Sequence, residues 1–260
     1  FLFLVSLAFV AVSLPGHAQQ INQSTEVSIA HWDVESLKRV KDQKGLTFDI
    51  GETWVTRYLK DGGEMRNVTG LRRPWNWRQG ARFVDIQRDD DLPEAFDWRE
   101  EVEGGLQPVR NQGNCGSCWS FAVTAVVESL IKISDPFAEP DLAEQTMVST
   151  CSNSGSCRGG YFSAFNYVQS RGLPDEAQDP YQARNTWCRR NLNPVAKTVS
   201  WAYVGDGRSS PTTEQIKAAI YEYGPVAVDV NASFGSYRGG VFNACNTRGT
   251  NHMVTLEGWN

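Results

Sequence analysis

One cysteine at the start of a long apolar run constrains this chain more than any other feature. Residues 119–132 are apolar at nearly every position, which is typical of a helix that is buried on all faces. Cys118 directly precedes this run, and a thiol at a helix N-terminus lies at the positive end of the helix dipole, which favours the thiolate. Gln112, six residues earlier, can donate a side-chain hydrogen bond to an oxyanion. The segment therefore predicts a cysteine nucleophile on a rigid helix.

The candidates for a base are few, because the chain has only three histidines: His17, His31 and His252. The first two lie in N-terminal segments that look removable, which leaves His252 as the imidazole for Cys118. A cysteine and a histidine distant in sequence can meet in a fold. The alternative for His252 is a histidine satisfied within the core of a strand.

The order of elements predicts an α+β chain of two halves. The first half has the helix at 119–132, a helix through Val148 capped by Asp141, and a helix over 160–171 stopped by Gly172. The second half alternates like strands, with one helix from Thr212 or Thr213 to Tyr221. Its expected strands are 198–204, 226–230 and 253–256.

The N-terminus predicts export. Residues 1–14 are almost wholly apolar, and Gly16-His17-Ala18 offers a small-residue cleavage site, so residues 1–18 are expected to be a partial signal peptide. A short membrane anchor is the alternative. Export implies an oxidising compartment, so the six cysteines are first interpreted as disulfide partners.

Five motifs in order resemble the papain family of cysteine proteases, and the likeness extends from about Leu92 to the last residue. One of them, around Cys118, is the family's signature for the catalytic cysteine. The five are Asp97-Trp98-Arg99, Cys115-Gly116-Ser117-Cys118-Trp119, Cys157-Arg158-Gly159-Gly160-Tyr161, Gly224-Pro225-Val226-Ala227-Val228 and Asn251-His252.

The resemblance implies a papain-like fold with a helical half, a β-barrel half and the active-site cleft between them. Residues 19–91 would be an inhibitory propeptide and 92–260 the protease domain; an accessory domain that stays attached is the alternative for 19–91. The resemblance also implies closing strands and an asparagine that orients the histidine, both beyond Asn260, so the protease domain is expected to be C-terminally incomplete and the activity of this chain itself uncertain.

The resemblance assigns the chemistry to three residues. Cys118 attacks the peptide carbonyl, Gln112 and the Cys118 amide hold the oxyanion, and His252 protonates the leaving amine and then activates water. In contact, the thiol and imidazole are expected to rest as thiolate and imidazolium, with the cysteine pKa lowered and the histidine pKa raised. No cofactor and no metal are expected.

The resemblance also places the substrate-binding residues. Gly159 and Gly160 are expected to let an extended peptide approach and pair with the backbone, although a tight turn would need glycine too. Tyr161 and Phe162 are expected to shape the pocket for the second residue before the cut; core packing is the alternative for Phe162. Asp229 and Met253 depart from the family pattern, and we expect Met253 to narrow this pocket and Asp229 to favour a basic or polar side chain. The alternative is that Asp229 points elsewhere.

For the cysteines, the resemblance implies disulfides Cys115–Cys157 and Cys151–Cys188, which leaves Cys245 unpaired. Two alternatives remain. One is a redox pair of Cys115 and Cys118 in an exported thiol–disulfide oxidoreductase, and the other is a zinc site built from Cys115, Cys118, Cys151 and Cys157.

A net charge of −5 without a basic tract predicts no nucleic-acid partner. We expect a monomeric, secreted zymogen with peptide or protein substrates, its own propeptide as inhibitor and no membrane anchor. The destination would be extracellular or a lysosome- or vacuole-like compartment, or the periplasm in a bacterium. A catalytically silent binding protein with the same fold is the remaining alternative.

Overall fold

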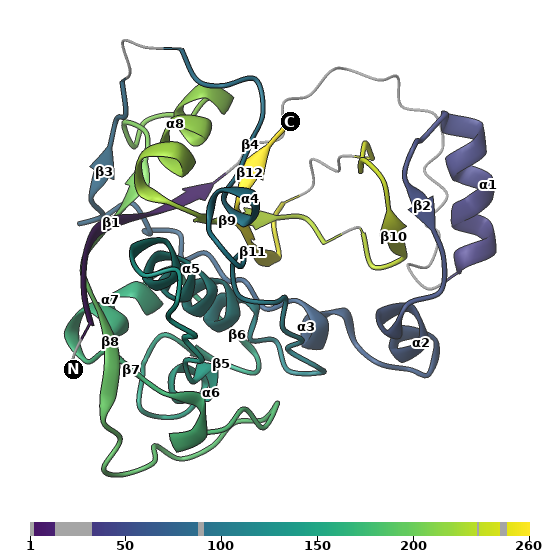
Figure 1. Ribbon diagram of the computed structural model, residues 1–260. Helices are drawn as coiled ribbons and strands as arrows, with labels where there is room; N and C mark the ends of the chain where they lie inside the picture. The colour runs from purple at the N-terminus through teal and green to yellow at the C-terminus, as the bar shows by residue number, and fades with distance from the viewer. Residues whose placement is uncertain (1–2, 14–32, 88–90, 233, 245–248) are drawn as a thin grey trace.

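The computed structural model describes residues 3–13, 33–87, 91–232, 234–244 and 249–260, and its architecture is α+β, as predicted (Figure 1). Helices pack on both faces of a six-stranded sheet. Within the described ranges, no helix is both long and apolar enough to cross a bilayer. The sheet contains β1 (Phe3–Ser13), β3 (Phe83–Val84), β7 (Leu173–Pro174), β8 (Pro194–Val204), β9 (Val226–Val230) and β11 (His252–Leu256).

Helix α5 (Cys118–Ser134) is the centre of the larger core. It is buried on nearly all sides, including Trp119 and Leu130 with no exposed surface, and it begins one residue before the predicted run. Because an apolar helix of this kind can only be stable when covered, its packing fixes the position of its first residue. Helices α6 (Glu144–Val148) and α7 (Ala164–Ser170) pack beside it.

The alternation of β9 explains the two cores on either side of the sheet. Ala227 joins the core around α5, whereas Val226 and Val228 join a second core under α8 (Thr213–Tyr223). Since side chains alternate along a strand, Asp229 lies on the α5 side together with Ala227. Met253, its cross-strand partner on β11, is in the α5 core as well.

The sheet is open within the described residues, which agrees with the expected papain-like fold without its closing strands. Its order is β11-β9-β1-β8-β3, with β7 paired to β8, and the terminal strands β11 and β3 do not pair with each other. The physical reason is that a barrel closes only when its two edges hydrogen-bond.

Residues 3–13, expected to belong to the signal peptide, form strand β1 in this structure. The strand runs parallel to both β8 and β9, with Phe3 opposite Ala196 and Ser13 opposite Asp229. The boundaries expected at residues 18 and 91 stay predictions.

The start of a helix was predicted correctly where the expected capping residue caps it, and wrongly where that residue has another partner. Thr212 caps α8 in a capping box with Gln215, as expected. Asp141 does not cap α6, because its carboxylate pairs with Arg110 and the helix begins only at Glu144. The predicted helix at 160–171 begins at Ala164, since Gly160 belongs to a small strand.

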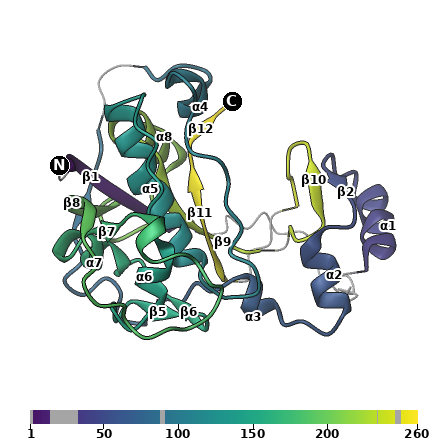
Figure 2. The ribbon, with the colours of Figure 1, turned by 60° about the horizontal axis from the view of Figure 1, so that its bottom comes forward.

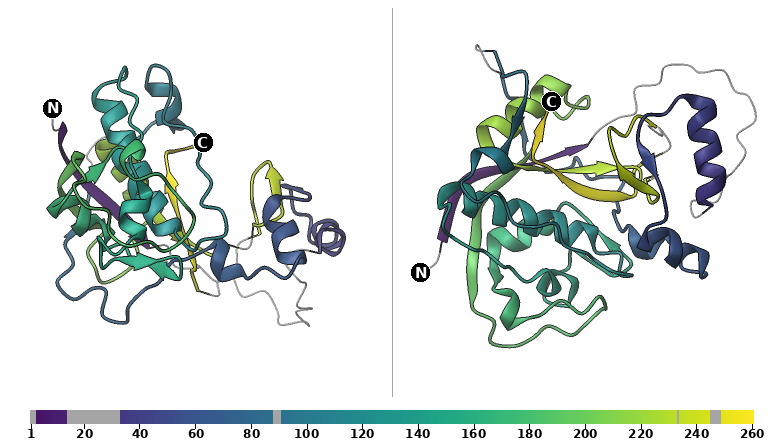
Figure 3. Two further views of the ribbon diagram at one scale, coloured as in Figure 1. Left: turned by 90° about the horizontal axis from the view of Figure 1, so that it is seen from below. Right: turned by 45° about the vertical axis from the view of Figure 1, so that its right-hand side comes forward.

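Residues 33–68 form a group that stands beside the main body (Figures 2 and 3). It consists of α1 (Val34–Lys44), β2 (Asp49–Ile50), α2 (Trp54–Lys60) and α3 (Met65–Val68). Strand β10 (Tyr237–Gly239) pairs antiparallel with β2 and holds the group to the rest of the chain. The remaining short elements are β4 (Phe96–Asp97), α4 (Trp98–Glu101), β5 (Gly155–Ser156), β6 (Gly159–Gly160), a 3-10 turn (Glu176–Gln178) and β12 (Gly258–Trp259).

Leu130→Ala is expected to lower the free energy of unfolding by about 2–5 kcal/mol, because it leaves a cavity in the α5 core. Urea denaturation measures the change. Val199→Ala, at an apolar position on β8 that is 48% exposed, is the control and should change stability by less than about 0.5 kcal/mol. Equal effects of both substitutions would contradict the packing described for α5.

Candidate active site

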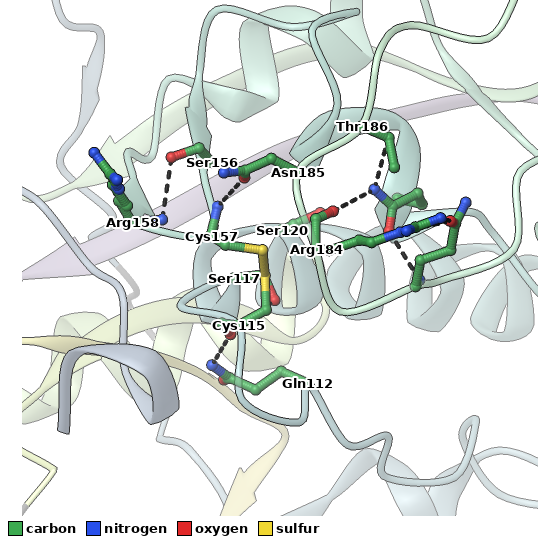
Figure 4. Close-up of a disulfide and its surroundings, with 12 residues drawn as sticks. Gln112, Cys115, Ser117, Ser120, Ser156, Cys157, Arg158, Arg184, Asn185 and Thr186 are labelled. Atoms are coloured by element: carbon green, nitrogen blue, oxygen red, sulfur yellow. Dashed lines mark hydrogen bonds between the residues drawn. A yellow bond between two sulfur atoms is a disulfide. The ribbon is translucent and has the colours of Figure 1, made fainter. Parts of the chain in front are cut away.

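Cys118 is the first residue of α5 and is held from both sides. Three residues before it, Cys115 forms a disulfide with Cys157 (Figure 4). The Gly116 amide donates to the Cys157 carbonyl. Cys118 itself is 1% exposed and is the free cysteine among the described residues. The nucleophile candidate is therefore fixed at a helix N-terminus by a covalent crosslink three residues away.

The other cysteines follow the expected pattern where they are described. Cys151 and Cys188 form the second disulfide. Because Cys115 is bonded to Cys157, it neither pairs with Cys118 nor serves in a four-cysteine zinc site. Cys245, like His17 and His31, lies outside the described residues.

The Gln112 side chain lies beside the start of α5 and already binds peptide carbonyls. Its Nε2 donates to the carbonyl of Cys115 at 2.8 Å and to the carbonyl of Thr69 at 3.0 Å. The Tyr181 hydroxyl donates to the Gln112 backbone carbonyl at 2.8 Å and lies 2.6 Å from the Ser117 hydroxyl, which fixes the loop to the helix. An amide that holds a carbonyl oxygen in this position is suited to hold an oxyanion.

His252 lies on β11, which packs against the beginning of α5. The next residue, Met253, donates its backbone N–H to the Cys118 sulfur at 3.3 Å. Cys118, Gln112 and His252 all line one cavity of about 290 Å³. The Nδ1 atom of His252 is buried and has no hydrogen-bond partner among the described residues. The structure therefore brings together the three residues predicted to be catalytic.

The protonation states differ from the expected ion pair. Burial raises the pKa of Cys118 to about 12, against a smaller lowering by the hydrogen bond from the Met253 amide. Burial lowers the pKa of His252 to about 4. In this form the pair is a thiol and a neutral imidazole, because desolvation disfavours both charged forms.

The chain segment 69–73 lies beside the site and hydrogen-bonds to the residues around it. Its backbone forms a short parallel bridge to β6, in which the Gly160 amide donates to the Gly70 carbonyl and the Arg72 amide donates to the Gly160 carbonyl, both at 2.8 Å. On the other side, the amides of Gly70 and Leu71 donate to the Asn251 carbonyl. An extended segment therefore crosses between Gly160 and the strand that carries His252.

Segment 69–73 pairs with Gly160, and substrate binding by Gly159 and Gly160 stays a prediction. A Cβ on Gly159 would approach the Gly70 carbonyl oxygen to 2.7 Å, and one on Gly160 would collide with the Trp119 ring. Gly70 itself has φ +135°, and a Cβ there would overlap the Gly116 carbonyl. Glycine is required at these positions because a Cβ would collide with the backbone of segment 69–73 at Gly159, with the Trp119 ring at Gly160 and with Gly116 at Gly70.

The remaining predicted subsite residues divide into two groups. Tyr161 and Phe162 line a second cavity of about 290 Å³ together with Arg73, Trp77 and Tyr203. Phe162 is 6% exposed and packs in the α5 core, as the core-packing alternative predicted. Its role in shaping a substrate pocket stays a prediction. Asp229 and Met253 are buried opposite each other on β9 and β11, and the Asp229 carboxylate pairs with Arg73.

Sequence reasoning missed a group of buried acids at the same cavity as Cys118. Burial raises the pKa of Glu128 to about 7 and that of Glu144 to about 8. Arg110 lies between them, with its Nη2 3.5 Å from Glu128 and its Nε 4.0 Å from Glu144. Glu128 also accepts the Leu142 amide at 2.7 Å. The signal in the sequence for this buried group was an acidic residue, Glu128, within the otherwise apolar 119–132 run, together with Glu144 in α6.

A cysteine at a helix N-terminus beside a histidine-bearing strand is compatible with a cysteine hydrolase site, and the comparisons with known proteins identify the class. A model for "Papain family cysteine protease" matches residues 92–260. Caricain of Carica papaya is 36% identical over 98% of this chain and 80% of its own sequence. Cathepsin R of Mus musculus is 28% identical over 98% of this chain and 84% of its own.

The fold comparison extends beyond the matched domain. The structure of digestive procathepsin L2 proteinase from Tenebrio molitor larval midgut superposes with a TM-score of 0.74 at 29% identity, covering 86% of this chain and 74% of that one. The chain belongs to the papain family of cysteine proteases. It is thus a hydrolase of the cysteine peptidase class.

Gly70→Ala is expected to increase the rate at which iodoacetamide labels Cys118 by about tenfold or more, because the added methyl group pushes segment 69–73 away from Gly116. Peptide mass spectrometry locates and times the label. Gly62→Ala is the matched control: Gly62 also has positive φ, +89°, but a Cβ there meets nothing within 4 Å. Unchanged labelling in Gly70→Ala would contradict occlusion by this segment.

Glu144→Gln is expected to stabilise the protein at high pH. A carboxyl whose pKa is raised from 4.5 to about 8 in the fold contributes fully below pH 4.5 and loses stability as pH rises toward 8. The substitution should therefore change little at pH 4.5 and add about 1–3 kcal/mol at pH 8, measured by urea denaturation. Glu103→Gln, at an exposed position, is the control; a gain at pH 4.5 equal to that at pH 8 would refute the assignment.

Proposed function

We propose that the chain is the proform of a secreted cysteine peptidase in which Cys118 is the nucleophile, His252 the acid–base and Gln112 an oxyanion donor. The observation that carries the proposal is the Gln112 amide, which holds the Thr69 peptide carbonyl beside Cys118 and His252. A substrate carbonyl in the place of Thr69 would meet the same donor.

In the proposed reaction, the Cys118 thiolate attacks the substrate carbonyl carbon, and the negative charge that develops on oxygen is held by Gln112. His252 donates its proton to the leaving amine, which leaves an acyl-enzyme on Cys118. The neutral imidazole then takes a proton from water, and the resulting hydroxide releases the acid product. The family resemblance assigns the orientation of His252 to an asparagine.

Residues 19–91 act as the propeptide in this proposal and inhibit by two effects of the same contact. Segment 69–73 occupies the backbone partners of a peptide, and in this proposal it also shields Cys118, which is 1% exposed, from water. Burial raises the thiol pKa and lowers the imidazole pKa, so neither group is charged. Release of the segment rehydrates both groups and permits thiolate–imidazolium formation.

The proposed destination is the secretory pathway, with an extracellular, lysosome- or vacuole-like compartment for the product. Two disulfides are consistent with an oxidising environment, and residues 1–18 have the composition of a leader. Peptides or proteins are the proposed substrates, and the protein is proposed to act as a monomer.

Peptide hydrolysis after removal of the propeptide tests these roles. Cys118→Ser or His252→Ala is expected to lower kcat/KM by about 10⁴-fold, and Gln112→Ala by about 10²- to 10³-fold in kcat. Gln107→Ala is the matched control, since this nearby amide hydrogen-bonds to Glu139 and should leave the rate unchanged. Full stability with no hydrolysis by the unsubstituted protein would instead favour the silent binding protein.

A further inference from the structure

Asp229 is a carboxylate that the fold has buried without completing its hydrogen bonds. It has no exposed surface and lies near the C-terminal end of β9 on the side of the α5 core. Its Oδ2 accepts the Thr250 hydroxyl at 2.8 Å and pairs with Arg73, whereas its Oδ1 is buried without a hydrogen-bond partner among the described residues. An isolated buried carboxylate is costly, so this site requires a cation.

The cation that fills it comes from the segment that blocks the cleft. Arg73 follows directly after the residues that pair with Gly160, and its side chain remains 34% exposed while its guanidinium contacts Asp229. The guanidinium also lies 5.2 Å from the centre of the Trp77 ring, at the edge of the cavity lined by Tyr161 and Phe162. A path therefore leads from the surface to the carboxylate, and Arg73 occupies it.

Arg73, which supplies the cation in this contact, belongs to the proposed propeptide, whereas Asp229 and Thr250 belong to the protease domain. Departure of segment 69–73 removes Arg73 and leaves the Asp229 carboxylate with Thr250 alone. A cationic side chain of a substrate that enters along the same path would then meet the Asp229 carboxylate in place of Arg73. An arginine is the better fit, since a guanidinium can bridge two carboxylate oxygens.

We propose that Asp229 makes the active-site cleft selective for substrates with a basic side chain, arginine above all, beside Gly160, and that Arg73 of the propeptide occupies this subsite in the proform. The inference rests on the proposed peptidase function and adds its substrate class. It also explains why the propeptide carries a charged residue into a contact with a fully buried group.

The propeptide itself serves as the first probe of the subsite, in the full chain. Hydrogen exchange at the amides of residues 70–72, which are bonded to Asn251 and Gly160, reports how firmly the segment is held and needs no reactive cysteine. Arg73→Lys should accelerate exchange slightly and Arg73→Gln by about tenfold or more. In an Asp229→Asn background, the difference between Arg73 and Arg73→Gln should vanish.

Arg78→Gln is the matched control. Arg78 also lies over the Trp77 ring, at 4.3 Å, but it has no contact with Asp229 and should leave the exchange rates unchanged. Equal exchange in Arg73→Gln and the unsubstituted chain would overturn the assignment of the subsite.

Peptidyl chloromethyl ketones test the substrate class in a Gly70→Ala/Arg73→Gln chain, whose cleft is opened. The probes carry arginine, its uncharged isostere citrulline or norleucine at the second residue before the reactive carbonyl. The arginine probe should label Cys118 about tenfold or more faster than the citrulline probe, and Asp229→Asn should bring the ratio close to one.

Iodoacetamide, which has no side chain to select, separates the two levels of the account. If it labels Cys118 while the arginine and citrulline probes react equally, the specificity inference is wrong and the nucleophile assignment stands. If neither iodoacetamide nor any peptidyl probe labels Cys118, the proposed function fails, and the exchange series still decides what side chain the Asp229 pocket prefers.

Discussion

Burial of helix α5 is the constraint on which the rest of the structure depends. A helix apolar on nearly every face can exist only when other elements cover it, and the sheet, α6 and α7 do so. That packing places Cys118 at the one end of α5 that meets β11, and the Cys115–Cys157 bond holds the preceding loop. Core packing therefore positions Cys118, the strand that carries His252 and the loop that carries Gln112, and contacts within the site are not needed for this.

The same burial controls the chemistry. A helix N-terminus favours a thiolate only where water or a partner charge compensates the lost hydration, and beneath segment 69–73 desolvation dominates, as the raised pKa of Cys118 indicates. Segment 69–73 uses only its own backbone carbonyls and amides in its hydrogen bonds to the Gly160 and Asn251 backbones and to the Gln112 side chain. Recognition of this kind is independent of sequence, and the Arg73–Asp229 pair adds a side-chain-specific contact to it.

Local signals in the sequence were sufficient for the elements that depend on local rules. The extent of α5 and the Thr212 capping box followed from sequence patterns, and the motifs pointed to Cys118 and His252, which line one cavity. The expectation that Asp141 caps a helix was wrong, because its carboxylate pairs with the distant Arg110. The pKa of Cys118 was expected to be lowered and that of His252 to be raised, and both shifts have the opposite direction. The expectation considered only the attraction between the two charged groups, whereas burial in the fold disfavours both charges.

Long-range contacts account for the rest. Gly116 lies against Gly70, whose positive φ also favours glycine, and neither property can be inferred from the local sequence. In the same way, the role of Arg73 depends on its contact with Asp229. Likewise, Glu128 and Glu144 look like ordinary helix acids until Arg110 is placed between them. Neither spacing nor composition encodes such encounters.

The pH dependence of Cys118 alkylation in the full chain tests the central claim most directly, namely that segment 69–73 holds the nucleophile as a buried neutral thiol. The account predicts slow labelling from about pH 5 to 8 and a rise only above about pH 9, toward the raised pKa. Rapid labelling already near pH 5, without a further rise until about pH 9, would mean that the thiolate–imidazolium pair exists beneath the segment and would contradict the account.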